Sequence, residues 1–167
     1  MGQLSFRQER YLGNSRRFPV CRVLKTPLLP IDTNVRGQME SNVLVVDDSA
    51  AIRKILQRVL RQTGMIIGEI YEAGDGQEAL ELLKTKNVGL VLSDINMPKM
   101  DGLQMLAAIK AVPAWSEIPV VMITTEGGES KVGEAVKLGA AGYVRKPFTA
   151  DQIKEKLAGI FEPAVTL

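Results

Sequence analysis

From Asn42 onward, the hydrophobic positions of the chain alternate between two patterns: short continuous apolar runs and longer segments with helical spacing. Continuous runs of this length are typical of strands that are buried on both faces. They occupy residues 43–46, 66–71, 90–93, 119–124 and 141–144. Helical spacing, with apolar residues three or four positions apart, follows each run. The predicted helices cover the segment between Ser49 and Gly64, then residues 78–84, 103–111, 129–138 and 151–161.

Residues at the ends of these segments favour the same boundaries. Ser49 and Asp101 suit helix N-caps, and Gly64 suits the position just past a helix C-terminus. The inward face of the first helix is predicted to consist of Ile52, Ile55, Leu56, Val59 and Leu60. That of the second comprises Ala79, Leu82 and Leu83, and that of the last comprises Ile153, Leu157, Ile160 and Phe161.

Five strands, each followed by a helix, predict an α/β fold. Because every strand reads as buried on both faces, the sheet is expected to be parallel and doubly wound, with helices on each side. Right-handed crossovers leave few possible topologies. In such sheets, functional groups gather at the carboxyl ends of the strands, near the point where the strand order reverses.

Polar residues stand at four of these strand ends. Asp47 and Asp48 follow the first strand, Asp94 ends the third, Thr124 ends the fourth, and Lys146 follows the fifth. If the first and third strands are neighbours, about 4.8 Å apart, the three carboxylates converge and call for a cation such as Mg²⁺. With a hydroxyl and an ammonium nearby, this group would stabilise a phosphoryl group transferred to a carboxylate.

Composition narrows the chemistry further. The sequence contains no histidine and a single cysteine, Cys21, which excludes Ser-His-Asp catalysis, histidine-ligated metals, internal disulfides and cysteine-built zinc sites. No apolar run approaches the roughly 18 residues needed to cross a membrane. The available groups are carboxylates, hydroxyls and lysines, which favour hard cations.

The charge is unevenly distributed along the chain. Residues 1–38 hold seven basic and two acidic groups, whereas the remainder holds 14 basic and 17 acidic ones. We expect residues 1–40 to form a disordered basic leader. Alternatives are a targeting peptide, a nucleic-acid-binding arm supported by charge alone, or a mis-called start, in which case Met39 begins the protein. Residues 163–167 are expected to form a short tail.

Four stretches carry a family resemblance: VLVVDDS, VLSDINMPKMDG, VVMITTE and GYVRKPF, in this order and each at a strand end. Together they span about residues 41–162, and they resemble a response-regulator receiver domain of the chemotaxis-regulator type. The resemblance implies a flavodoxin-like (βα)5 fold with strand order 2-1-3-4-5, an order that comes from the family and not from the hydrophobic pattern.

The resemblance also implies roles at the acidic site. Asp94 matches the phosphoacceptor of the family. Asp47 and Asp48 match the acidic pair that holds Mg²⁺, with Asp48 as a direct ligand. Asp94 itself and the backbone carbonyl of Asn96 match further ligands of the ion.

Three more positions match residues that respond to the phosphoryl group. Thr124 matches a hydroxyl that moves toward it, and Lys146 matches a lysine that forms an ion pair with it. Tyr143 matches an aromatic switch that turns inward when the threonine moves. The peptide bond between Lys146 and Pro147 is expected to be cis, which is uncommon even before proline.

These roles predict a phosphorylation-activated switch of a two-component system. A histidine kinase would phosphorylate Asp94, and the face formed by the fourth helix, fifth strand and fifth helix would then change its affinity for a protein target. Chemotaxis or motility, or a phosphorelay, would be the setting. We expect a cytoplasmic monomer without nucleic-acid or membrane partners, which catalyses only its own phosphorylation and dephosphorylation. Because six residues follow Phe161, no attached output domain is expected.

Two other functional classes stay open at this point. A phosphatase of the haloacid-dehalogenase type also forms an aspartyl phosphate, but it carries a D-x-D pattern on the first strand, whereas the pair here is adjacent. A flavodoxin-like FMN binder needs a hydroxyl- and glycine-rich loop after the first strand, and the acidic stretch DDSAAIRK is unfavourable for phosphate. Asp75-Gly76 is interpreted as a turn only, and Trp115 as a cover for the edge of the core.

Overall fold

The computed structural model describes residues 41–125 and 129–161, in which strands and helices alternate. The predictions made for residues 1–40 and 163–167 lie outside the described residues. The strands are β1 (Ser41–Val46), β2 (Ile67–Ala73), β3 (Leu90–Asp94), β4 (Val120–Thr124) and β5 (Gly142–Arg145). The helices are α1 (Ala50–Gln62), α2 (Gly76–Thr85), α3 (Gly102–Ala111), α4 (Glu129–Lys137) and α5 (Ala150–Phe161). None of the helices in these ranges is long and apolar enough to span a membrane.

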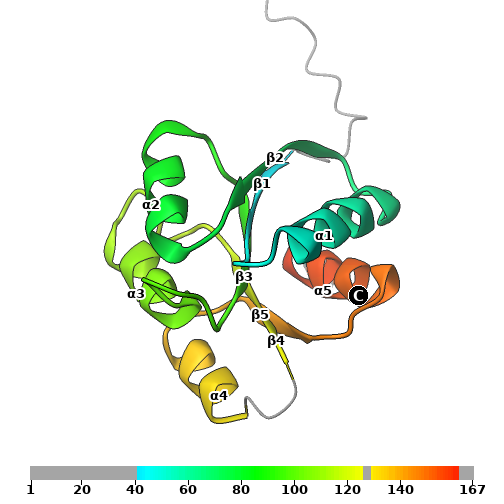
Figure 1. The fold of residues 1–167 in the computed structure, drawn as a ribbon. Coiled ribbons are helices and arrows are strands. Elements are labelled where there is room, and N and C mark those ends of the chain that lie inside the picture. The colour runs from blue at the N-terminus through cyan, green and yellow to red at the C-terminus, as the bar shows by residue number, and fades with distance from the viewer. Residues whose placement is uncertain (1–40, 126–128, 162–167) are drawn as a thin grey trace, which may run out of the picture. The chain divides into compact units, whose positions relative to one another are not determined.

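The strands form one parallel sheet in the order β2-β1-β3-β4-β5, which confirms the predicted doubly wound arrangement. From β1, the chain first adds β2 on one side of the sheet and then adds β3, β4 and β5 in turn on the other side. The order therefore reverses between β1 and β3, at the centre of the sheet. Helices α1 and α5 cover one face, and α2, α3 and α4 lie on the other (Figure 1).

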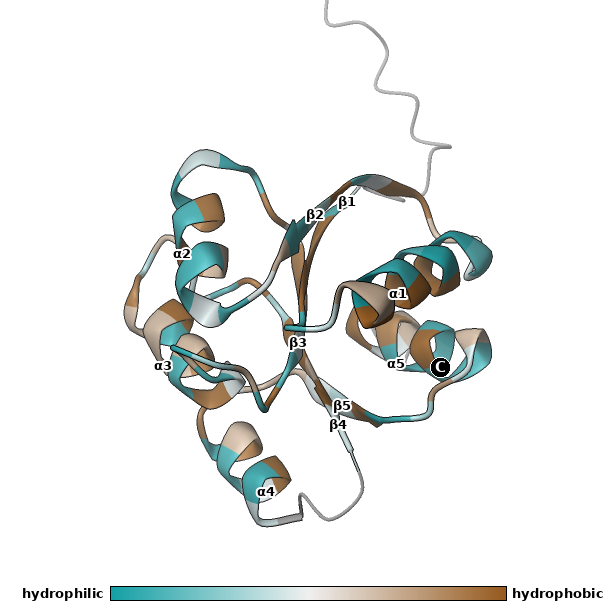
Figure 2. Ribbon diagram, viewed as in Figure 1, coloured by the Kyte–Doolittle hydropathy of each residue, from teal (hydrophilic) through white to brown (hydrophobic). Residues whose placement is uncertain are grey.

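Alternation along the strands divides the buried side chains into two cores. In β1, Val43 and Val45 pack with the buried residues of α1 and α5, whereas Leu44 and Val46 pack with those of α2 and α3. The strands and the inward sides of the helices are correspondingly hydrophobic (Figure 2). Each fully buried aliphatic side chain contributes about 1.5–3 kcal/mol to folding, so both helical layers are held against the sheet by burial.

The predicted helix ends are confirmed. The Ser49 hydroxyl accepts a hydrogen bond from a backbone N–H in the first turn of α1, and Gly64, just past its end, has a φ of 73°. Asp101 forms a reciprocal capping box with Gln104 at the start of α3. Such caps satisfy backbone groups that a helix terminus leaves unpaired.

Two predictions about inward faces are wrong. Ile55 is 46% exposed and Phe161 is 38% exposed. Ile55 precedes the buried Leu56 by one residue, which on a helix is a rotation of about 100° away from the core side. Phe161 is the last residue of α5 and follows Ile160, which packs against the core, by one residue, again a rotation of about 100°. The other predicted inward positions are buried or partly buried, and Trp115 packs against the edge of the core as expected.

Candidate functional site

Three aspartates meet at the carboxyl edge of the sheet. Because β1 and β3 pair with Val46 opposite Ser93, the residues that follow, Asp47 and Asp94, emerge side by side. Carboxylate oxygens of Asp47, Asp48 and Asp94 all lie within 4.8 Å of one another. Asp47 and Asp94 are buried, and Asp48 is exposed to solvent. The structure therefore brings together the acidic residues that the strand ends pointed to.

Lys146 supplies the opposite charge. Its Nζ lies 2.8 Å from Asp47 Oδ2 and 3.5 Å from Asp94 Oδ1, with only 16% of its side chain exposed. The backbone N–H of Lys146 donates to the Thr124 carbonyl, which fixes the start of the β5–α5 loop. The bond between Lys146 and Pro147 is cis, as expected. A partly buried ammonium in this position lowers the repulsion between the two carboxylates.

The electrostatics of Asp94 are set mainly by burial. Burial raises the pKa of Asp94 above its ordinary value of 3.8, because a carboxylate in a low-dielectric surrounding loses hydration. The nearby charge of Lys146 lowers this pKa in part, and the negative charge of Asp47 raises it further. A cation beside Asp94 would stabilise the charged form of its carboxylate and lower this pKa.

Asp47 is held by a network that the sequence did not reveal. Its Oδ1 accepts a hydrogen bond from the Ser49 backbone N–H at 2.8 Å. Its backbone carbonyl accepts one from Arg53 Nη1 at 2.7 Å, and Arg53 Nε bonds in turn to Glu72 on β2 at 3.0 Å. Hydrogen bonds from Lys54 and then Arg53 lower the pKa of Glu72 from 4.5 to about 2. Arg53 on α1 therefore joins Glu72 on β2 to Asp47, which follows β1. These residues come together only in the folded chain.

The backbone of Asp94 is fixed by two small neighbours. The Ser93 hydroxyl donates to the Asp94 carbonyl at 2.8 Å. Gly102, at the start of α3, packs so closely that a Cβ there would lie 2.1 Å from the same carbonyl oxygen. Its N–H also donates to the Ile95 carbonyl at 2.9 Å. The glycine of the MDG motif is therefore required by a close backbone approach.

Thr124 lies at the end of β4 and is buried, 3% exposed. Its hydroxyl donates to the adjacent Thr125 carbonyl at 3.0 Å. Thr124 therefore lies at a strand end, as predicted, and its hydroxyl is engaged in a local hydrogen bond. Its movement toward a phosphoryl group stays a prediction.

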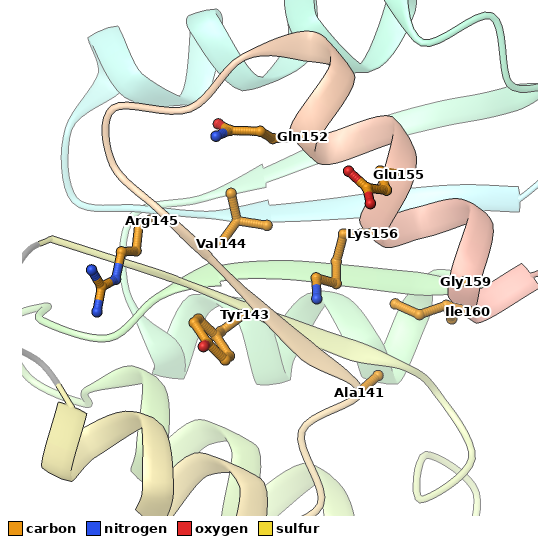
Figure 3. A pocket seen from close by; sticks show the side chains of 9 residues that line it. All are labelled: Ala141, Tyr143, Val144, Arg145, Gln152, Glu155, Lys156, Gly159 and Ile160. Carbon is orange, nitrogen blue, oxygen red and sulfur yellow. The ribbon is translucent and has the colours of Figure 1, made fainter.

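Tyr143 on β5 is 41% exposed. The Lys156 ammonium, reaching across from α5, lies 5.7 Å from the centre of the Tyr143 ring, a cation–π distance. Both residues line a pocket between β5 and α5 (Figure 3). The predicted switch residue therefore stands on an open surface, and its role as a switch stays a prediction.

Asn96 lies on the loop that follows Asp94, and its side chain is exposed. Its Oδ1 accepts a hydrogen bond from the Lys131 ammonium in the first turn of α4. The backbone carbonyl of Asn96 remains a predicted metal ligand. The contact with Lys131 was not predicted, because neither exposed residue belongs to a periodic pattern.

The same loop has a second attachment. Asp75 caps the N-terminus of α2, accepting a hydrogen bond from the Glu78 backbone at 2.9 Å, so its interpretation as a turn only was too limited. Lys99, which has a positive φ of 62°, bonds to the other Asp75 oxygen at 2.7 Å. This ammonium and the helix N–H groups lower the pKa of Asp75. Lys99 therefore ties the acceptor loop to α2.

The acidic cluster fits Mg²⁺ by its chemistry and its dimensions. Asp47, Asp48 and Asp94 each offer a carboxylate oxygen, and the three oxygens lie within 4.8 Å of one another, close enough to share one cation. A bound Mg²⁺ would neutralise part of their negative charge. Oxygen donors alone, without nitrogen or sulfur, are the set that this cation prefers.

Comparison with known proteins agrees with the fold. The model of the response regulator receiver domain matches residues 43–158, and the chain belongs to this family. It is similar to a chemotaxis protein CheY homolog of Campylobacter jejuni, with 40% identity over 119 residues that cover 71% of this chain and 90% of the relative.

Solved structures show the same likeness. Chemotaxis response regulator CheY4 of Vibrio cholerae is 33% identical with a TM-score of 0.63, covering 71% of this chain and 96% of the other. The phosphorylated cyanobacterial phytochrome response regulator RcpA is 28% identical with a TM-score of 0.62, covering 72% and 91%. As a CheY-like receiver domain, the chain is of the class of phosphorylation-activated two-component switches, which are regulatory and not metabolic proteins.

Proposed function

We propose that Asp94 accepts a phosphoryl group from a phosphohistidine of a histidine kinase, with Mg²⁺ held by Asp47, Asp48, Asp94 and the Asn96 backbone carbonyl. The observation that carries this proposal is the cluster of three carboxylates within 4.8 Å, two of them buried, with an ammonium 3.5 Å from the acceptor. The related regulator RcpA is described in its phosphorylated form, which supports the same chemistry.

The transfer is a displacement at phosphorus. A carboxylate oxygen of Asp94 forms the new P–O bond, the P–N bond of the donor breaks, and the electron pair leaves with the imidazole nitrogen. Lys146 is placed to neutralise charge on the phosphoryl oxygens, since its Nζ already lies 3.5 Å from Asp94. When bound to Asp47, Asp48 and Asp94, Mg²⁺ would supply further positive charge beside the phosphoryl group.

The output is a change in binding. The Thr124 hydroxyl would exchange its bond to the Thr125 carbonyl for one to the phosphoryl group, and Tyr143 would follow by turning inward. This alters the surface of α4, β5 and α5, where a protein target docks. Two-state switching of this kind requires that the two arrangements differ little in free energy and that the phosphoryl group stabilises one of them more than the other. We place the protein in the cytoplasm, as a monomer serving chemotaxis or motility or a phosphorelay, without nucleic-acid partners.

Incubation with acetyl phosphate tests the proposal. Intact-mass measurement should show the gain of one phosphoryl group in the presence of Mg²⁺, and none in EDTA. Asp94→Asn should abolish the gain, whereas Asp151→Asn, at an exposed acid in the first turn of α5, should leave it unchanged. An unchanged gain in Asp94→Asn would overturn the acceptor assignment. Sustained turnover of small phosphate esters would instead favour a phosphatase.

A further inference from the structure

A side-chain contact joins the acceptor loop to the first turn of α4. The Lys131 ammonium donates a hydrogen bond to Asn96 Oδ1, and Asn96 stands two residues after Asp94. The two residues are 35 positions apart in the sequence, so the fold alone creates the contact. A charged donor makes such a bond stronger than a neutral one.

Helix α4 is weakly held in other respects. Among its side chains that the structure describes, Ala135 is the one that is buried, and Val136 is 58% exposed. Gly133, in the middle of the helix, adds no side-chain contact and lowers helix propensity. A helix with so little buried surface opens locally at low cost, so one hydrogen bond in its first turn has a measurable influence.

We propose that the bond between Lys131 and Asn96 transmits the charge of the acidic pocket to α4. This inference rests on the proposed function, since it requires a cation near Asp94. The Asn96 backbone carbonyl is a proposed metal ligand, and the side chain of the same residue holds Lys131. A divalent cation on that residue repels the ammonium and weakens the bond.

The proposal gives a definite order of effects. Mg²⁺ alone adds positive charge and loosens the first turn of α4. A phosphoryl group, or trifluoroberyllate bound to Asp94 as its mimic, adds negative charge to the Mg²⁺-loaded pocket and restores part of the attraction for Lys131. The backbone amides of α4 are therefore best protected from hydrogen exchange without the cation. They are least protected with Mg²⁺ alone, and their protection is intermediate with Mg²⁺ and the mimic.

Amide hydrogen exchange of Gly133 to Ala135 measures this opening directly. In the wild type, Mg²⁺ should accelerate their exchange about two- to tenfold, the range that the loss of one hydrogen bond spans. In Lys131→Met and in Asn96→Ala, which keeps the backbone carbonyl, exchange should already be fast and insensitive to Mg²⁺. Lys131→Arg retains a charged donor and should recover the response.

A matched control comes from the same helix. Lys137→Met removes an exposed positive charge in the last turn of α4 and should leave the wild-type response unchanged. A Mg²⁺ response that survives in Lys131→Met would overturn the proposal. Calorimetric titration of Mg²⁺ separates the two claims. Binding without a response in α4 refutes the role of Lys131 alone, whereas no binding to the wild type refutes the proposed metal site and this inference with it.

Discussion

Lys146 donates its short hydrogen bond to Asp47, with 2.8 Å between Nζ and Oδ2. The ammonium is 0.7 Å farther from Asp94, at 3.5 Å. Asp94, the proposed nucleophile, therefore has a positive charge nearby but no short hydrogen bond to it. Asp47 thus holds the lysine in place, and a phosphoryl group arriving on Asp94 would bring three oxygens toward the same ammonium. The site is arranged for an incoming anion.

Replacing an exposed member of the acidic cluster should stabilise the metal-free protein. Asp48→Asn removes one of three carboxylates that lie within 4.8 Å, and with it part of their repulsion. We expect the free energy of unfolding in EDTA to rise by about 1 kcal/mol, since an exposed charge at this distance is strongly screened. Urea unfolding measures the change.

The same variant should respond less to the cation. Mg²⁺ binds the folded state and stabilises it, and Asp48→Asn loses a proposed direct ligand. Wild type should therefore gain more unfolding free energy from millimolar Mg²⁺ than the variant does. Equal gains in both proteins would remove Asp48 from the metal site.

Glu72 should support stability in a defined pH range. Its pKa in the folded protein is about 2, below the ordinary 4.5, because Lys54 and Arg53 bind its charged form. The contribution is complete above pH 4.5 and is lost as the pH falls toward 2, because the unfolded state takes up the proton first. Glu72→Gln should cost about 1 kcal/mol at pH 7, allowing for partial exposure, and less at pH 3. A cost that is the same at both pH values would contradict this account.

Gly102→Ala should damage both the fold and the site. The added Cβ would lie 2.1 Å from the Asp94 carbonyl oxygen, so the backbone must shift at a cost of about 1–3 kcal/mol. We also expect slower phosphorylation by acetyl phosphate, because the shift displaces the acceptor. Gly159→Ala in α5, where a Cβ meets no atom within 4 Å, is the control and should be neutral or stabilising. Normal stability of Gly102→Ala would show that the loop relaxes freely.

Gly133→Ala should stabilise α4. A Cβ at this position meets no atom within 4 Å, and alanine is preferred to glycine inside a helix by about 0.5–1 kcal/mol. Slower amide exchange in α4 is the expected result. If α4 must open for a target to bind, the same variant should also bind its target more weakly. Unchanged exchange would mean that other contacts determine the stability of α4.

The sequence predicted the elements of this fold because each strand is buried on both faces. In β3, all five residues from Leu90 to Asp94 are buried, which produces a continuous apolar run ending in a carboxylate. Parallel pairing then places the strand ends together, so Asp47 and Asp94 were expected to meet. Caps such as Ser49 and Asp101 act within one turn, and local chemistry was sufficient to predict them.

Long-range polar contacts were not predictable. Arg53 reaches Glu72, and Lys131 reaches Asn96, between elements that are far apart in the sequence. Exposed charged side chains follow no period, and their partners depend on the final positions of loops and helix ends. Ile55 shows the same limit for apolar residues, because hydrophobic spacing does not identify which residue lies at the margin of a buried face.

The most direct test of the central claim is to locate the phosphoryl group on the chain. The protein is incubated with acetyl phosphate and Mg²⁺ and then treated with borohydride, which reduces an acyl phosphate of aspartate to homoserine. The product is digested, and the peptides are sequenced by mass spectrometry. Our account predicts homoserine at position 94 and none at Asp47 or Asp48. Homoserine at another aspartate, with Asp94 unmodified, would contradict it.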